Sequence, residues 1–339
     1  QSHHKELDPR VRNAILLKRA PAGDSAAANP LYLQLIIHEL VMMNRYDHAQ
    51  MDALTAAGMN PEDAIATYMT DLVEASDGTP DGEYLTYLTR ISTLFGTKPF
   101  FTVVLALASS RHGLREEDLE NLFRRTGMSW NASDFAWIRQ LLREHLAQGD
   151  MGQWEFTHGL LRDALLQSAD PDKMEWINCH LSLALFDGAD RFCARERMHH
   201  LWLARLPEVA AMAIANSDSH WDTEYAEGLS QIWNLRHSEW ARLLARGEPG
   251  NGQDGTPEDF VIALLQNTGD LAHAAHVRLA RFVCEHLLDA LHVSFPAGQR
   301  IRLLTETLTM LRACGTSDVE TRATESLLLM YLGLLYTGT

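Results

Sequence analysis

The chain has 339 residues, a formal net charge of −16, and a composition that is 46% hydrophobic and 22% charged. This length is sufficient for two or three domains with their own cores, and the composition excludes a mostly disordered chain. So acidic a chain repels phosphate backbones, which disfavours non-specific binding to nucleic acid or anionic membranes. Protein or small-molecule partners are favoured instead.

Neither a membrane anchor nor a secretion signal is expected. The longest apolar candidate, Pro30 to Met43, contains Gln34, His38 and Glu39 and falls short of the roughly 18 apolar residues that a span needs. The first ten residues lack an apolar core followed by small residues. We therefore predict a cytoplasmic protein whose four cysteines are free and buried: Cys179, Cys193, Cys284 and Cys314.

Helix signals dominate the first part of the chain. Asn29 is placed to cap a helix that begins at Pro30, and Asn60 to cap one that begins at Pro61. The Gly/Pro/Asp-rich stretch 77–82 then interrupts the pattern. The helices expected after it are Tyr84 to Thr93, Lys98 to Ser109 and Glu116 to Phe123.

A helix and a strand pair are predicted next. Apolar residues recur at helical spacing in a set that ends at Leu146: Phe135, Ile138, Leu141, Leu142 and Leu146. A turn at 149–152 precedes Trp154 and Phe156, which alternate with polar residues as in a strand. With a further helix from Gly159 to Leu166, this order is typical of a winged helix-turn-helix.

Beyond residue 172 the pattern is helical again. Connectors are expected at 187–190, 216–219 and 247–256, and the last of these is the most linker-like stretch of the chain. Residues 257–339 are typical of helix pairs in a TPR-like repeat array, although no clean 34-residue consensus is present. The predicted fold class is therefore mainly α, with one short β-hairpin.

Motifs for catalysis are missing from the sequence. It contains no G-x-x-x-x-G-K-[ST] loop and no G-x-S-x-G elbow. The neighbouring pairs Cys179–His180, Cys193 with His199, and Cys284 with His286 do not have the spacing of a zinc site, and buried thiols and surface histidines explain them as well. We expect no catalytic residue, metal or cofactor in this segment.

Three stretches together resemble one protein family. The segment NPLYL at 29–33, the turn SRHGL at 110–114 and the segment WEFTH at 154–158 occur in this order. They resemble stretches that follow the nucleotide-binding domain in NACHT-type STAND signalling ATPases, including the nephrocystin and telomerase-associated branches and bacterial sensors. The resemblance covers residues 5–170, about half of the chain.

The resemblance implies a parent ATPase that binds ATP or ADP with Mg²⁺ and switches between a closed monomer and an active oligomer. In the family, the proline of the first stretch packs near the adenine, and the winged-helix histidine reaches the phosphates of ADP. Carried over, the nucleotide-contacting residues are Pro30, its neighbour Leu31, and His158. The implied partners are the parent's own upstream nucleotide-binding domain, a protein trigger on the carboxyl-terminal arm, and further copies of the parent.

Five domains follow from the resemblance and the helix pattern. They are the tail of a nucleotide-binding domain at 1–28, a helical lid at 29–95, a winged helix at 96–170, a helical domain at 171–250 and a repeat-like sensor arm at 257–339. The function implied is regulatory, with innate immune or anti-phage defence as a plausible setting.

Two other functions stay open at this stage. In an ATPase-coupled transcription regulator the winged helix would read DNA, and Arg111 and His112 could suggest such contacts. However, the candidate recognition helix, Asp134 to Leu146, offers few basic or polar side chains that could contact DNA. They are Arg139, Arg143 and His145. A purely structural repeat scaffold is the third possibility.

Simpler roles also exist for the singled-out residues. Pro30 suits the first turn of any helix, and His158 could be a cap or a buried core residue. The tryptophans Trp221, Trp233 and Trp240 are most simply explained by core packing, unless they gather on an exposed face as a binding hot spot.

Overall fold

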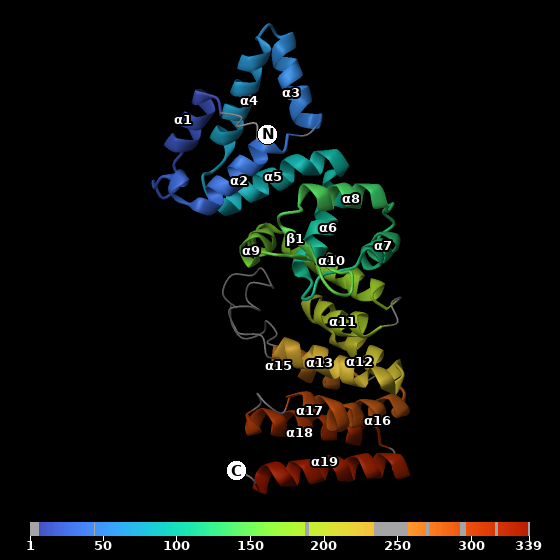
Figure 1. Cartoon of the computed structure of the whole chain (residues 1–339). Helices are drawn as coiled ribbons and strands as arrows, with labels where there is room; N and C mark the ends of the chain where they lie inside the picture. Colours follow the sequence, from blue (N-terminus) through green and yellow to red (C-terminus); the bar gives the residue numbers. More distant parts are fainter. Residues whose placement is uncertain are drawn as a thin grey trace. The chain divides into compact units, whose positions relative to one another are not determined.

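The computed structural model describes residues 7–43, 45–186, 190–233, 257–268, 271–291, 296–315 and 318–337. Within them the protein is mainly α-helical, with one two-stranded antiparallel hairpin (Figure 1). The linker predicted at 247–256 lies outside the described residues, as does most of the connector predicted at 187–190. No helix of the described part is long and apolar enough to cross a membrane.

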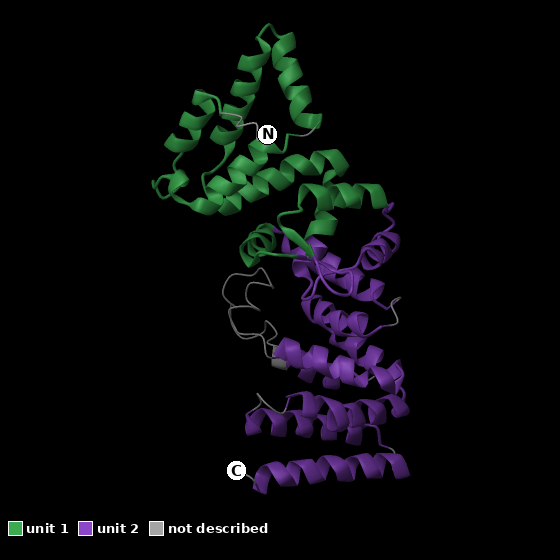
Figure 2. Ribbon diagram, viewed as in Figure 1, with its two compact units in different colours: residues 1–104, 131–147, 156–168 green, residues 105–130, 148–155, 169–339 purple. Residues whose placement is uncertain are grey.

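The chain divides into two compact units, coloured separately in Figure 2. Unit 1 consists of residues 1–104, 131–147 and 156–168, and unit 2 of residues 105–130, 148–155 and 169–339. The stretch 96–170, for which a single domain is predicted, therefore contributes to both units.

Unit 1 is built mainly from helices of the first hundred residues. These are α1 (Pro9–Leu17), α2 (Pro30–Val41), α3 (Arg45–Ala56), α4 (Pro61–Ala75) and α5 (Pro80–Phe95), with a 3-10 turn η1 (Ala26–Ala28) before α2. Helix α4 contacts α1 and α3, while α2 contacts α5. The apolar core of these helices includes Val11, Ile15, Tyr32, Ile36, Leu40 and Val73.

Side-chain caps explain where these helices begin. The Asn29 side chain accepts the N–H of Leu31 at 3.0 Å, and Asn60 accepts the N–H of Asp63 at 2.8 Å, which confirms both predicted starts. The interruption predicted at 77–82 is partly wrong, because α5 already begins at Pro80. Thr79 caps it, and proline is tolerated in a first turn that has no partner for its N–H group.

The middle of the chain forms three helices, the hairpin and a further helix. They are α6 (Thr97–Ser109), α7 (Glu116–Arg125), α8 (Ala132–Leu141), β1 (Leu146–Gln148), β2 (Trp154–Phe156) and α9 (Gly159–Ser168). The strand predicted around Trp154 and Phe156 is confirmed. The helix predicted to extend to Leu146 is wrong, because α8 ends at Leu141 and Leu146 pairs in β1. Apolar spacing alone does not separate the end of a helix from the start of a strand.

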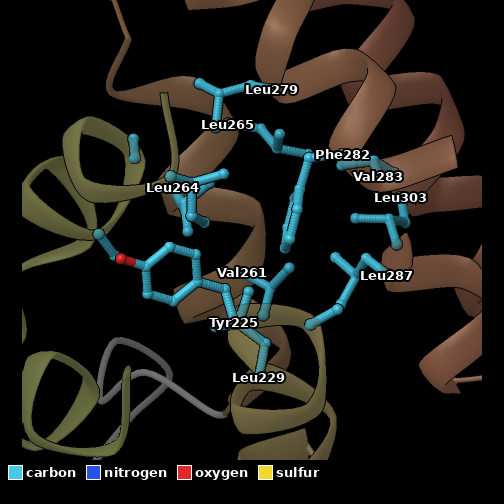
Figure 3. Close-up of a cluster of buried hydrophobic side chains, with 14 of the residues drawn as sticks. Tyr225, Leu229, Val261, Leu264, Leu265, Leu279, Phe282, Val283, Leu287 and Leu303 are labelled. Carbon is cyan, nitrogen blue, oxygen red and sulfur yellow. The ribbon is translucent and has the colours of Figure 1, made fainter. Parts of the chain in front are cut away.

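Unit 2 continues as a series of helices, and those that follow residue 190 share one apolar core (Figure 3). They are α10 (Pro171–Ala184), α11 (Arg191–Leu203), α12 (Pro207–Asn216), η2 (Ser219–Trp221), α13 (Asp222–Trp233), α15 (Pro257–Gln266), α16 (His273–Phe282), η3 (Val283–Leu287), α17 (Leu288–Leu291), α18 (Ala297–Ala313) and α19 (Val319–Thr337). Trp221 and Trp233 pack against this core, while Trp240 lies outside the described residues. All four cysteines are free, but only Cys193 and Cys284 are buried.

One turn of unit 2 departs from regular α-helix. Between α16 and α17, the η3 segment is a π-helix whose Val283, Cys284 and Leu287 are buried. It contacts α13, α18 and α19. Three of the five side chains of the wide turn therefore pack in the interior of unit 2, while that of Glu285 is exposed.

Candidate functional site

A network of buried charges crosses unit 1. Glu39 on α2, Asp47 on α3, and Glu83 and Arg90 on α5 are each at most 8% exposed. Charged side chains are almost never buried to this degree unless they are paired. Their pairing therefore determines how the helices of unit 1 are held together.

Arg90 is the centre of this network. Its Nε lies 3.0 Å from Glu39 Oε1, and its Nη1 donates a hydrogen bond to Asp47 Oδ1. Tyr68 on α4 donates to the same Asp47 oxygen at 2.6 Å. A single guanidinium thus connects α2, α3 and α5 directly, and α4 through the tyrosine hydroxyl.

Glu39 and Glu83 form a second pair, across α2 and α5. Burial raises the pKa of Glu39, and a hydrogen bond with Glu83 raises it further, to about 9, against the opposite pull of Arg90. The Glu39 carboxyl is therefore held toward its neutral form, because burial and the neighbouring Glu83 both disfavour its charged form.

Beside this network, a histidine cluster joins α2, α5 and the turn after α8. The His145 ring lies 5.9 Å from the His38 ring and 5.1 Å from the Tyr84 ring, centroid to centroid. His145 is 5% exposed, and neither of its ring nitrogens has a hydrogen-bond partner. On the other side of the cluster, His38 Nδ1 lies 3.4 Å from the Glu144 carboxylate.

The surroundings of His145 keep its ring neutral. Burial lowers its pKa to about 4, and the nearby His38 and His158 act in the same direction, against Glu144. The Tyr84 hydroxyl is buried and also has no hydrogen-bond partner. Buried polar groups without partners are costly, so this cluster is a locally unfavourable part of an otherwise packed unit.

The three residues implied in nucleotide contact lie at element ends in unit 1. Pro30 occupies the first turn of α2 and is exposed, and Leu31 beside it is half-buried. His158 is exposed and immediately precedes α9, so it is not a buried core residue. Helix α5 contacts both α2 and α9, but no hydrogen bond joins His158 to Pro30 or Leu31.

The main chain before His158 is well fixed. The Thr157 N–H donates to the carbonyl oxygen of His145 at 2.9 Å. The side chain of Thr157 donates to the carbonyl of Glu144 at 3.4 Å. These two hydrogen bonds join the residue just before His158 to the segment that carries His145.

In unit 2, the turn SRHGL is held by a buried carboxylate. Glu196 on α11 is 1% exposed and accepts the N–H groups of Arg111 at 3.1 Å and His112 at 2.8 Å. Burial alone would raise its pKa, but the His200 hydrogen bond and nearby histidines lower it to about 2. Gly113 lies so close to Trp154 that an added Cβ would be 2.4 Å from its carbonyl oxygen.

The structure gives little support to DNA contact by the residues that the sequence suggested for it. The backbone N–H groups of Arg111 and His112 are bound by Glu196, and both side chains contact Gln231 on α13. The assignment of His145 as a reader on the recognition helix is wrong, because it is buried and follows the end of α8. Arg139 lies over the Phe135 ring, 4.9 Å from its centroid.

Sequence reasoning missed the buried charges of unit 1. Glu39 and Arg90 were not considered as site residues, since a charge on an amphipathic helix is ordinarily solvated. A signal was nevertheless present, because Glu39 follows Leu35 and Ile36 at the spacing of the buried face. The described residues contain no group of three side chains placed to hold a metal ion.

Comparisons with protein-family models, with curated proteins and with solved structures found no match to this chain. The features that bear on function are therefore the geometry of the chain itself and the three stretches that resemble STAND ATPases.

Proposed function

We propose that this chain is a regulatory and sensing segment of a STAND-type signalling ATPase, in which the bound nucleotide controls oligomerisation. The three stretches that resemble the family support this proposal through the elements they form. The first begins a capped helix at Pro30, the second forms the turn held by Glu196, and the third leads from β2 into α9.

The observation that carries the proposal is the position of His158. Its side chain is exposed beside the amino-terminal end of α9, where free N–H groups and the helix dipole favour an anion. Its backbone is fixed through Thr157. A histidine in this setting is suited to donate a hydrogen bond to a phosphate of ADP held by an upstream domain.

The order of helices and strands supports the division into domains that the sequence predicts. In this proposal residues 29–95 form a helical lid and residues 96–170 a winged helix, because three helices, a hairpin and a helix follow one another there. Residues 171–250 form a helical domain, and residues 257–339 begin a repeat-like sensor arm.

The proposal implies partners that act on different parts of the chain. The upstream domain of the parent binds ATP or ADP with Mg²⁺ and packs against the lid, near Pro30 and Leu31. A protein trigger acts on the arm, and activation joins several copies of the parent. Innate immune or anti-phage defence is the setting in which such a switch is useful.

The gene sequence upstream of Gln1 is the most direct test. We expect it to encode a G-x-x-x-x-G-K-[ST] loop, followed by a strand that ends in paired acidic residues, because these hold the phosphates and Mg²⁺ in such ATPases. An upstream region that lacks this loop would contradict the family assignment.

In the full-length parent, His158→Ala is expected to raise basal activity. A charge-assisted hydrogen bond to ADP contributes about 1.5–3 kcal/mol to the closed state, and its loss shifts a two-state equilibrium by roughly ten- to a hundredfold. Oligomer formation and effector output without trigger measure this shift.

The matched control is His220→Ala, which removes another exposed histidine, in unit 2. Basal output in this control should equal that of the unchanged parent. If His158→Ala instead leaves basal output unchanged and lowers the melting temperature, His158 has a structural role and the nucleotide-sensing role is refuted.

A further inference from the structure

Unit 2 contains a pocket of about 610 Å³, lined by residues of α7 and α10–α13 and of the turns between them. Its volume lies within the range of about 300–1,000 Å³ that small-molecule sites occupy. None of the residues singled out from the sequence for nucleotide contact lines it. The pocket is therefore a separate candidate for ligand binding.

Much of the lining is apolar and aromatic. The rings of Phe186, Trp221 and Tyr225 line it together with Val209 and Met212 of α12. Phe186 is 37% exposed and Met212 49% exposed, although both are large apolar side chains. Exposed aromatic and thioether groups around a hollow favour a flat apolar ligand.

Two guanidinium groups add positive charge to this lining. Arg197 on α11 is 6% exposed, and it donates hydrogen bonds to the Tyr225 hydroxyl at 2.8 Å and to the Leu185 carbonyl at 2.6 Å. Its Cζ lies 3.8 Å from the centroid of the Phe186 ring. This guanidinium is thus held in a fixed place at the aromatic wall, and the guanidinium of Arg125 on α7, which is exposed and screened by water, also lines the pocket.

Among the described residues that line the pocket, one is acidic, and its side chain is directed toward solvent. The Asp218 side chain is 87% exposed, and its carboxylate lies 3.9 Å from His220 Nδ1. In water such a charge is screened, whereas a cation at a buried wall acts through a lower dielectric. Asp218 therefore offsets little of the positive charge that Arg197 places at the wall of the pocket.

We propose that this pocket binds a planar aromatic carboxylate, with the ring against Phe186 and Trp221 and the carboxylate directed toward Arg197 and Arg125. The ring gains apolar and stacking contacts, and the two guanidinium groups select for the negative charge. The proposal rests on unit 2 alone, so its failure would leave the STAND assignment unaffected.

Calorimetric titration of the chain with indole-3-acetate tests this proposal. A ligand of this size is expected to bind with a Kd of about 1 mM. Indole-3-acetamide, which lacks the charge, and hexanoate, which lacks the ring, should each bind about tenfold more weakly or not at all.

Two variants and a control locate the site. Met212→Glu places a negative charge in the wall and is expected to weaken indole-3-acetate binding about tenfold or more, as like charges repel. Met330→Glu makes the same change on α19, where Met330 is 51% exposed, and should leave binding unchanged. Arg125→Gln, at an exposed position, should also weaken binding and gives an answer even if Met212→Glu unfolds the pocket.

Several results would overturn the proposal. The first is absence of binding at millimolar indole-3-acetate. The second is that indole-3-acetamide or hexanoate binds as tightly as indole-3-acetate. The third is that Arg125→Gln and a folded Met212→Glu variant both bind indole-3-acetate as tightly as the unchanged chain. Far-ultraviolet circular dichroism of each variant establishes whether it is folded.

Discussion

Replacement of Arg90 by methionine is expected to destabilise unit 1 by about 3–5 kcal/mol, because it leaves the partners of a buried ion pair without compensation. Asp47, at 0% exposure, would remain without its cation, and Glu39, at 2% exposure, would lose the guanidinium 3.0 Å away. A loss of this size is a large fraction of the stability of an ordinary domain, about 5–15 kcal/mol in total. Hydrogen exchange of α2–α5, compared with that of α10–α13, measures the loss and assigns it to unit 1.

Arg10→Met is a matched control for this variant. Arg10 also bridges two carboxylates of unit 1, at 3.1 Å from Asp8 and 2.8 Å from Asp63, but its side chain is 50% exposed. Exposed ion pairs contribute little because water screens them, so no measurable change in exchange is expected. Equal effects of the two substitutions would show that burial of the network does not determine its contribution.

Acidification from pH 6.5 to pH 4 is expected to weaken unit 1 through His145, on the order of 3 kcal/mol at the lower end. The pKa of this histidine is lowered from 6.5 to about 4 in the folded chain. The unfolded chain therefore takes up the proton at higher pH than the folded chain does. Stability from the neutral ring is present above pH 6.5 and is lost as the pH falls toward 4.

His145→Phe should remove this contribution, since phenylalanine fills a similar space beside Tyr84 and does not titrate. The measurement is the unfolding free energy of the unchanged protein and of His145→Phe between pH 4 and 7, and the difference between the two curves gives the contribution of His145. His220→Phe, at an exposed histidine of unit 2, should retain the unchanged protein's pH dependence. Parallel curves for the unchanged protein and His145→Phe would contradict the assignment.

The helix starts of unit 1 could be predicted because their signals are local. Asn29 with Pro30 and Asn60 with Pro61 specify a cap and a first turn within a few residues. Helix α3 was not predicted, and the reason is also physical. Only Asp47 and Met51 of its twelve residues are buried, so the sequence shows no apolar stripe of helical period.

The candidate site of unit 1 was largely hidden from the sequence because its partners are distant in the chain. The interaction of Glu39 with Arg90 spans about fifty residues, and that of His38 with His145 more than a hundred. No local pattern indicates which charges meet across helices. His158 could be singled out only by family resemblance, and its exposure before α9 follows from where the hairpin ends.

The π-helical turn at Val283–Leu287 has a consequence for insertions and deletions in unit 2. A π-turn contains one residue more than the α-helical path between the same ends. A one-residue deletion within it would restore regular α-helix and leave the buried faces of α16 and α17 in register. The same deletion inside α18 would rotate every following side chain by about 100° away from the core. Among these helices, η3 is therefore the place where a one-residue deletion is expected to disturb the packing least.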